Sequence, residues 1–136
     1  MDKLAIQLAL HGAVVLVVSL CAGLMTYRAI LNEERAAAWH LAHAGGTARG
    51  VMLMALAAIV RLPALPLREL SLVAWLLIFF TWTSVFAMVI AAASGQRGLG
   101  FRGSITNKLV FVLYLVGGVA VFPACVALIA GLLRAL

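Results

Sequence analysis

Apolar residues occupy four long stretches of this 136-residue chain, and polar residues fall mainly between them. The stretches cover roughly residues Leu4–Met25, Gly46–Leu65, Leu70–Ala93 and Leu109–Leu133. Each is close to the ~20 residues that an α-helix needs to cross the hydrocarbon core of a bilayer. The pattern therefore predicts an all-α membrane protein, a single domain over residues 1–136 that forms a bundle of four transmembrane helices.

The composition supports the same class of protein. Hydrophobic residues make up 66% of the chain and charged residues only 10%, and the mean hydropathy is +1.19. A soluble domain cannot bury that much apolar surface. The first apolar stretch is longer than the apolar part of a signal peptide and lacks an A-x-A-like cleavage site, so we expect it to remain in the protein as a helix.

The net charge does not alter the predicted class of protein. Ten Lys and Arg against four Asp and Glu give a formal net charge of +6. The basic residues stand singly between the apolar stretches, without the basic run or patch that nucleic-acid-binding proteins carry. They fit anchoring to lipid headgroups, so we expect the lipid bilayer, and no nucleic acid, as a partner.

Histidine and glycine are concentrated in residues 39–46, WHLAHAGG, at the start of the second stretch. Imidazoles at membrane depth usually line a pathway or hold a cofactor. On a helix, His43, Gly46, Thr47 and Gly50 have the i, i+3, i+4, i+7 spacing of one face. Two interpretations stay open: the glycines allow another helix to approach closely, or they leave room for a flat macrocycle whose iron is ligated by His43.

The other two histidines also have two interpretations each. His11, inside the first stretch, is either a hydrogen-bonding residue between helices or part of the cofactor site. His40 stands one turn before His43. We expect it to be an interfacial residue beside Trp39, although a metal could bind at this i, i+3 spacing.

The second stretch contains an arginine whose placement the sequence leaves open. Arg49 and Arg61 bracket only eleven residues, too few to cross a bilayer at ~1.5 Å per residue. The helix must therefore extend past Arg49, beginning near Ala44. Arg49 then either reaches toward the headgroups or points into the bundle.

The third stretch has a small and mildly polar face, formed by Thr81, Ser84, Met88 and Ala91 at i, i+3, i+7, i+10 spacing. Methionine in an apolar helix usually fills space, but beside a metal it is a soft ligand. We expect Ser84 and Met88 to line a site.

Arg97 and Arg102 lie in the glycine-rich connection that follows the third stretch. They either pair with an anionic ligand such as haem propionates or anchor the connection at the membrane surface. Cys21 and Cys125 are expected to pack within helices. No C-x-x-C-H motif occurs, so any haem is non-covalent.

Several motifs along the chain together resemble the styrene oxide isomerase family. They are His11-Gly12, Trp39-x-x-Ala42-His43-x-Gly45, Gly50-Val51-Met52, Trp82 and Arg97-Gly98-Leu99-x-Phe101. That family consists of small four-span bacterial membrane proteins that convert aryl epoxides to aldehydes without redox turnover. The resemblance implies a homotrimer in the bacterial inner membrane that binds haem b between subunits, with His43 as the axial ligand. The ferric iron would then act as a Lewis acid on the oxygen of a small hydrophobic epoxide.

Two positions depart from the family pattern. The resemblance implies a tyrosine nine positions before the Arg-Gly-Leu motif and an asparagine six positions after the ligand histidine, which help to place the epoxide. Here these positions hold Met88 and Arg49. A thioether cannot donate a hydrogen bond, and a guanidinium brings a permanent charge.

The expected site therefore has two groups of residues. The catalytic pocket is predicted from Arg49, Ser84 and Met88, and the haem-binding residues are predicted to be His43, Gly46, Gly50, His11, Arg97 and Arg102. Two other functions stay open. One is a non-enzymatic haem protein for electron transfer or sensing, with His43 and Met88 both on iron. The other is a copper-handling protein that uses His40, His43, Met25 and Met88.

Overall fold

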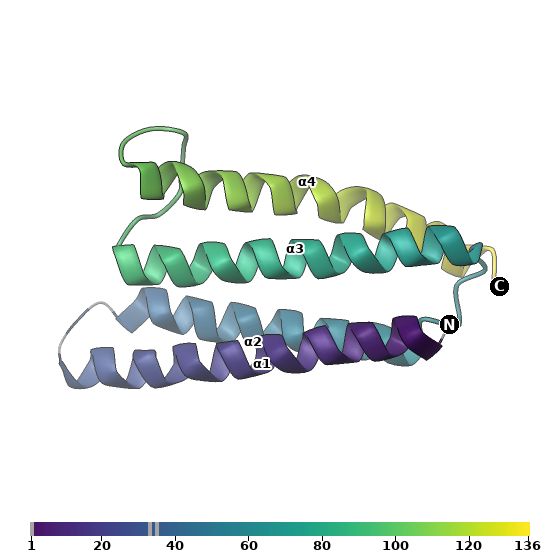
Figure 1. The fold of residues 1–136 in the computed structure, drawn as a ribbon, viewed down its shortest axis with the longest axis horizontal. Helices are drawn as coiled ribbons and strands as arrows, with labels where there is room; N and C mark the ends of the chain where they lie inside the picture. The colour runs from purple at the N-terminus through teal and green to yellow at the C-terminus, as the bar shows by residue number, and fades with distance from the viewer. Residues whose placement is uncertain (1, 33, 35) are drawn as a thin grey trace.

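The computed structural model describes every residue except 1, 33 and 35, and these described residues form four helices and no strand (Figure 1). The helices are α1 (Asp2–Leu31), α2 (Ala36–Ile59), α3 (Leu67–Ser94) and α4 (Ile105–Leu133). They run up and down alongside one another, and both termini lie at the same end of the bundle. The predicted all-α class is confirmed.

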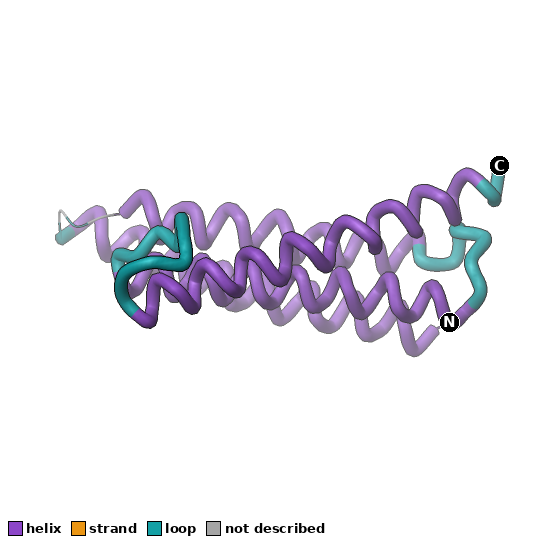
Figure 2. The backbone as a smooth tube through the Cα atoms, turned by 90° about the horizontal axis from the view of Figure 1, so that it is seen from above, coloured by secondary structure: helices purple, strands orange, loops and turns teal. Residues whose placement is uncertain are grey.

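Three of the helices, α1, α3 and α4, are long and apolar enough to cross a membrane. The α2 helix is shorter, with 24 residues against 28 to 30 in the others, and it carries Arg49 and a higher share of alanine and glycine. Figure 2 shows that the connections gather at the two ends of the bundle. This arrangement is that of a membrane helical bundle, in which backbone polar groups are satisfied within the helices.

The bounds of α2 differ from the prediction at both ends. The helix begins at Ala36 rather than near Ala44, because residues 36–38 are alanines, the best helix formers, although they are not part of a strongly apolar run. It ends at Ile59 rather than at Leu65. Two prolines, Pro63 and Pro66, follow closely, and helical geometry is unfavourable for the residue before a proline.

The α1 and α2 helices pack backbone against backbone. A Cβ added at Gly12 would lie 2.7 Å from the carbonyl oxygen of Gly50, and a Cβ added at Gly50 would lie 2.9 Å from the carbonyl oxygen of Gly12. A Cβ at Gly46 would lie 3.1 Å from the hydroxyl oxygen of Ser19. Small residues permit such close crossings in membranes, where van der Waals contact replaces the hydrophobic effect as the source of helix association.

The α3 helix is the centre of the bundle. It has the largest set of buried residues of the four helices and packs against each of α1, α2 and α4. The α2 and α4 helices, by contrast, make no close backbone contact with each other along their described lengths.

Candidate functional site

His43 lies on the side of α2 that faces α1. Its Nδ1 donates a hydrogen bond of 2.8 Å to the backbone carbonyl oxygen of Ser19. Because a carbonyl oxygen only accepts, Nδ1 carries the proton and Nε2 keeps its lone pair. The ring is partly exposed rather than enclosed. Histidines that ligate metals usually have this arrangement, with the second ring nitrogen donating to a carbonyl or carboxylate.

A glycine on α1 makes room for this ring. A Cβ added at Gly23 would lie 3.0 Å from Nδ1 of His43, so the imidazole rests on bare backbone. One turn away, the Ser19 hydroxyl bonds to the carbonyl oxygen of His43 and lies 2.7 Å from the hydroxyl of Thr47. Ser19 and Gly23 were not predicted as site residues. The sequence did contain a signal for them: Gly12, Ser19 and Gly23 have i, i+7, i+11 spacing, which places small residues on one face of α1.

The glycine face beside His43 is covered by α1. A Cβ at Gly50 would lie 2.8 Å from Cγ of Leu16, and Gly46 is buried against Ser19. The structure thus favours the first interpretation of Gly46 and Gly50, which is contact between helices. The expected room for a macrocycle beside them is not present within the chain, because α1 fills it.

Met88 lies on the other side of α2. It is 5% exposed, and its Sδ would be 2.7 Å from a Cβ added at Gly45. Gly45 follows His43 by two residues, or about 200° around the helix. Within one chain, His43 and Met88 therefore face opposite sides of α2, and the structure does not bring them together as two ligands of one iron.

Arg49 is on the same side of α2 as Gly45 and points into the bundle. Its Nη1 donates a 3.0 Å hydrogen bond to the carbonyl oxygen of Gly45, and its guanidinium carbon lies 5.3 Å from the ring centroid of Phe80. Its Nε is buried and has no partner among the described residues. Of the two placements left open by the sequence, the structure has the inward one.

A groove opens between α2 and α4 toward the end of the bundle that holds the first and third connections. It has a volume of ≈ 710 Å³. Leu41 of α2, Met88 and Ala91 of α3, and Tyr114 of α4 contribute to its wall, and Arg97 stands at its outer end. Arg49 is not part of this wall, but it lies next to Met88: a Cβ added at Gly45 would be 2.7 Å from Sδ of Met88 and 3.2 Å from Nη1 of Arg49.

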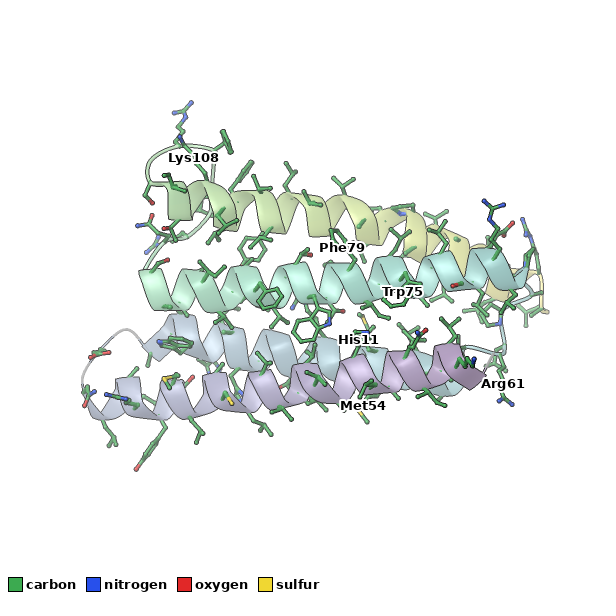
Figure 3. The ribbon with its side chains drawn as sticks, in the orientation of Figure 1. His11, Met54, Arg61, Trp75, Phe79 and Lys108 are labelled. Carbon is green, nitrogen blue, oxygen red and sulfur yellow. The ribbon has the colours of Figure 1, made fainter. Side chains whose placement is uncertain are left out.

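Ser84 and His11 lie at contacts between helices. Ser84 is 2% exposed and faces α4, where a Cβ added at Gly117 would lie 3.5 Å from its hydroxyl oxygen. His11 accepts a 3.1 Å hydrogen bond at Nδ1 from the indole N–H of Trp82, and its ring meets the edge of Trp75 (Figure 3). This bond joins α1 to α3, as the first of the two interpretations of His11 predicts.

The two arginines of the third connection, Arg97 and Arg102, are exposed. The connection itself is ordered by Asn107 of α4, a residue that the sequence did not single out. Its side chain accepts from the N–H of Gly98 and donates to the carbonyl oxygens of Gly100 and Arg102, at 2.8–2.9 Å. Gly98 has φ +61°, which favours glycine, and its buried position leaves no space for a side chain.

The residues of the copper interpretation do not converge. His40 and Met25 are exposed, and Met88 is on the far side of α2 from His43. Among the described residues, no three His, Cys, Asp or Glu side chains cluster as a metal site.

Comparison with known proteins agrees with the motif resemblance. The sequence model of the family described as styrene oxide isomerase matches residues 4–133, which is nearly the whole chain and covers all four helices except the first two residues of α1. No curated protein matches the chain. The family match rests on the full length of the bundle rather than on one motif, and the chain belongs to the styrene oxide isomerase family.

Proposed function

We propose that this protein isomerises epoxides to aldehydes in the membrane, using a non-covalent haem b that His43 binds. The observation that carries the proposal is the orientation of His43. Its Nδ1–H is fixed on the carbonyl oxygen of Ser19, which leaves Nε2 as the free ligand atom of a partly exposed ring. Histidine is the common proximal ligand of haem, so the donor chemistry of this site fits the group. When bound, ferric haem supplies a Lewis acid for the epoxide oxygen.

The chain's own residues orient the ligand and shelter the substrate. Ser19 and Gly23 determine where the imidazole lies, and α1 prevents it from turning. The groove with Met88 and Tyr114 offers an apolar wall to an aryl or alkyl epoxide. Keeping water away from an opening epoxide favours the aldehyde over the diol that hydrolysis would give.

His43 and the groove lie on opposite sides of α2, so a complete site needs two copies of the chain. His43 of one copy would then face the groove of its neighbour. Large apolar side chains exposed along the helices, among them Leu24, Phe86 and Phe122, provide surface for such contacts as well as for lipid. A homotrimer in the bacterial inner membrane is part of this proposal.

The test is the absorption spectrum of the purified protein followed by addition of styrene oxide. We expect a high-spin Soret band and formation of phenylacetaldehyde. The His43→Ala variant should lose haem and activity, whereas His40→Ala, at the exposed neighbouring histidine, should keep both.

Three outcomes would contradict the proposal. Equal loss of haem in the two variants would count against His43 as the single ligand. A low-spin spectrum with a sulfur-to-iron charge-transfer band would favour the electron-transfer or sensing alternative. A protein that takes up no haem but binds copper would favour the copper-handling alternative.

A further inference from the structure

Arg49 carries a positive charge deep within the bundle that the described part of the chain does not neutralise. It stands thirteen residues into α2, so its Cα is about 20 Å from the start of the helix. A guanidinium stays protonated in proteins. No described carboxylate is within salt-bridge distance of it, and its contacts are the Gly45 carbonyl and the Phe80 ring.

Most hydrogen-bonding capacity of Arg49 is unused. A guanidinium has five N–H donors, and the structure pairs one of them, on Nη1. Nε is buried without a partner. A buried donor left unpaired costs about 1–3 kcal/mol, and more when it is charged. An oxyanion that accepts from two of these donors would remove this cost, because carboxylates match the guanidinium fork.

The groove beside Arg49 has the size and lining of a site for a small organic molecule. Its volume of ≈ 710 Å³ is within the ~300–1,000 Å³ of typical ligand pockets. Leu41, Met88 and Ala91 are apolar parts of its wall, Tyr114 also lies in the wall, and Glu34, Gln96 and Arg97 add polar groups to it. The apolar part of the wall suits an apolar body. Met88 links the wall to Arg49, because a Cβ added at Gly45 would lie 2.7 Å from Sδ of Met88 and 3.2 Å from Nη1 of Arg49.

We propose that this groove selects substrates that carry a carboxylate, with the carboxylate paired to Arg49 and the apolar body against Met88. The inference rests on the proposed function in naming the ligand as the epoxide substrate. A preference for acidic substrates would distinguish this chain from isomerases of neutral aryl epoxides, because a neutral substrate leaves the charge of Arg49 uncompensated.

A lipid phosphate is the other source of an oxyanion in a membrane. Headgroups lie at the ends of transmembrane helices, whereas Arg49 is in the interior of α2. The geometry therefore favours a carboxylate on a small molecule that enters the groove.

The binding test uses 4-phenylbutyrate and its uncharged methyl ester as probes. Their affinities are measured by isothermal titration calorimetry on the full-length protein in phosphatidylcholine nanodiscs. We expect the acid to bind roughly tenfold or more tightly than the ester, as one charged hydrogen-bonded pair provides. Arg49→Gln should abolish this preference and Arg49→Lys should keep part of it. Arg68→Gln, which removes the same charge from an exposed position at the other end of the bundle, should leave the preference unchanged.

Equal binding of acid and ester by the wild-type protein would overturn the inference. An equal effect of Arg49→Gln and Arg68→Gln would also overturn it, because the preference would then follow net charge. Phosphatidylglycerol added to the nanodiscs should not displace the acid; displacement that Arg49→Gln abolishes would assign the site to lipid instead.

Measurements of turnover distinguish a failure of this inference from a failure of the proposed function. Styrene oxide and 4-carboxystyrene oxide are compared as substrates, and we expect the acid to have the higher kcat/KM in the wild type but not in Arg49→Gln. If neither epoxide is isomerised while the acid still binds through Arg49, the proposed function fails and the carboxylate site stands. If both are isomerised equally well by wild type and Arg49→Gln, the function stands and the carboxylate site fails.

Discussion

Replacing Gly23 with alanine tests how α1 holds the His43 ring. The new Cβ would lie 3.0 Å from Nδ1, 3.2 Å from Cε1 and 3.3 Å from Cγ of His43. Non-bonded carbon atoms prefer about 3.5–4.0 Å, so the ring must retreat by a few tenths of an ångström. The 2.8 Å bond from Nδ1 to the Ser19 carbonyl oxygen cannot lengthen far, because N–H···O bonds weaken beyond ~3.2 Å.

The expected cost follows from that one bond. Loss of a hydrogen bond costs about 0.5–1.5 kcal/mol, and loss of the partner that orients a metal-bound histidine usually lowers metal affinity by about 10- to 100-fold. We therefore expect Gly23→Ala to weaken haem binding about tenfold. The assay is titration of haem into the apoprotein, with the dissociation constant taken from the Soret absorbance.

Gly118→Ala is the matched control, since a Cβ there has nothing within 4 Å. Both variants gain the same helix propensity, up to about 1 kcal/mol, so their difference reports the contact with His43. Circular dichroism verifies that both remain helical. Wild-type haem affinity in Gly23→Ala would refute the placement of the ring against α1.

Three further predictions address the packing around the site. Gly50→Ala should lower the free energy of unfolding by about 1–3 kcal/mol through overpacking, because its Cβ would meet both side chain and backbone of α1. The measurement is the midpoint of thermal unfolding in detergent, and a midpoint equal to that of Gly118→Ala would contradict this contact. Trp82→Phe should cost about 0.5–1.5 kcal/mol of stability through loss of the bond to His11 and leave the haem spectrum unchanged, and a shifted Soret band would instead indicate that His11 touches the cofactor. Asn107→Ala removes three hydrogen bonds from the connection between α3 and α4, so hydrogen exchange should accelerate across residues 95–104 while the helices stay protected; unchanged exchange would mean that other contacts order this segment.

The sequence by itself determined the number of helices and the class of the protein. Four apolar stretches of spanning length can satisfy their backbone groups in a membrane only as helices or a closed barrel, and their length matches helices. The order and spacing of the histidine, glycine and arginine motifs also identified the family, which the match over residues 4–133 confirms. Both results depend on local features: length, composition and the order of residues along the chain.

Which neighbour covers each helix face was decided only by the tertiary structure. Periodicity grouped His43 with Gly46 and Gly50 on one face of α2, but it did not show that α1 fills this face. Nor did it show that Arg49 points inward, toward Phe80 of α3. In a soluble protein the contrast between apolar and polar faces indicates which side is buried. Here lipid and protein interior are equally apolar, so close packing of glycine and serine against the facing backbone, rather than polarity, selects the partner of each face.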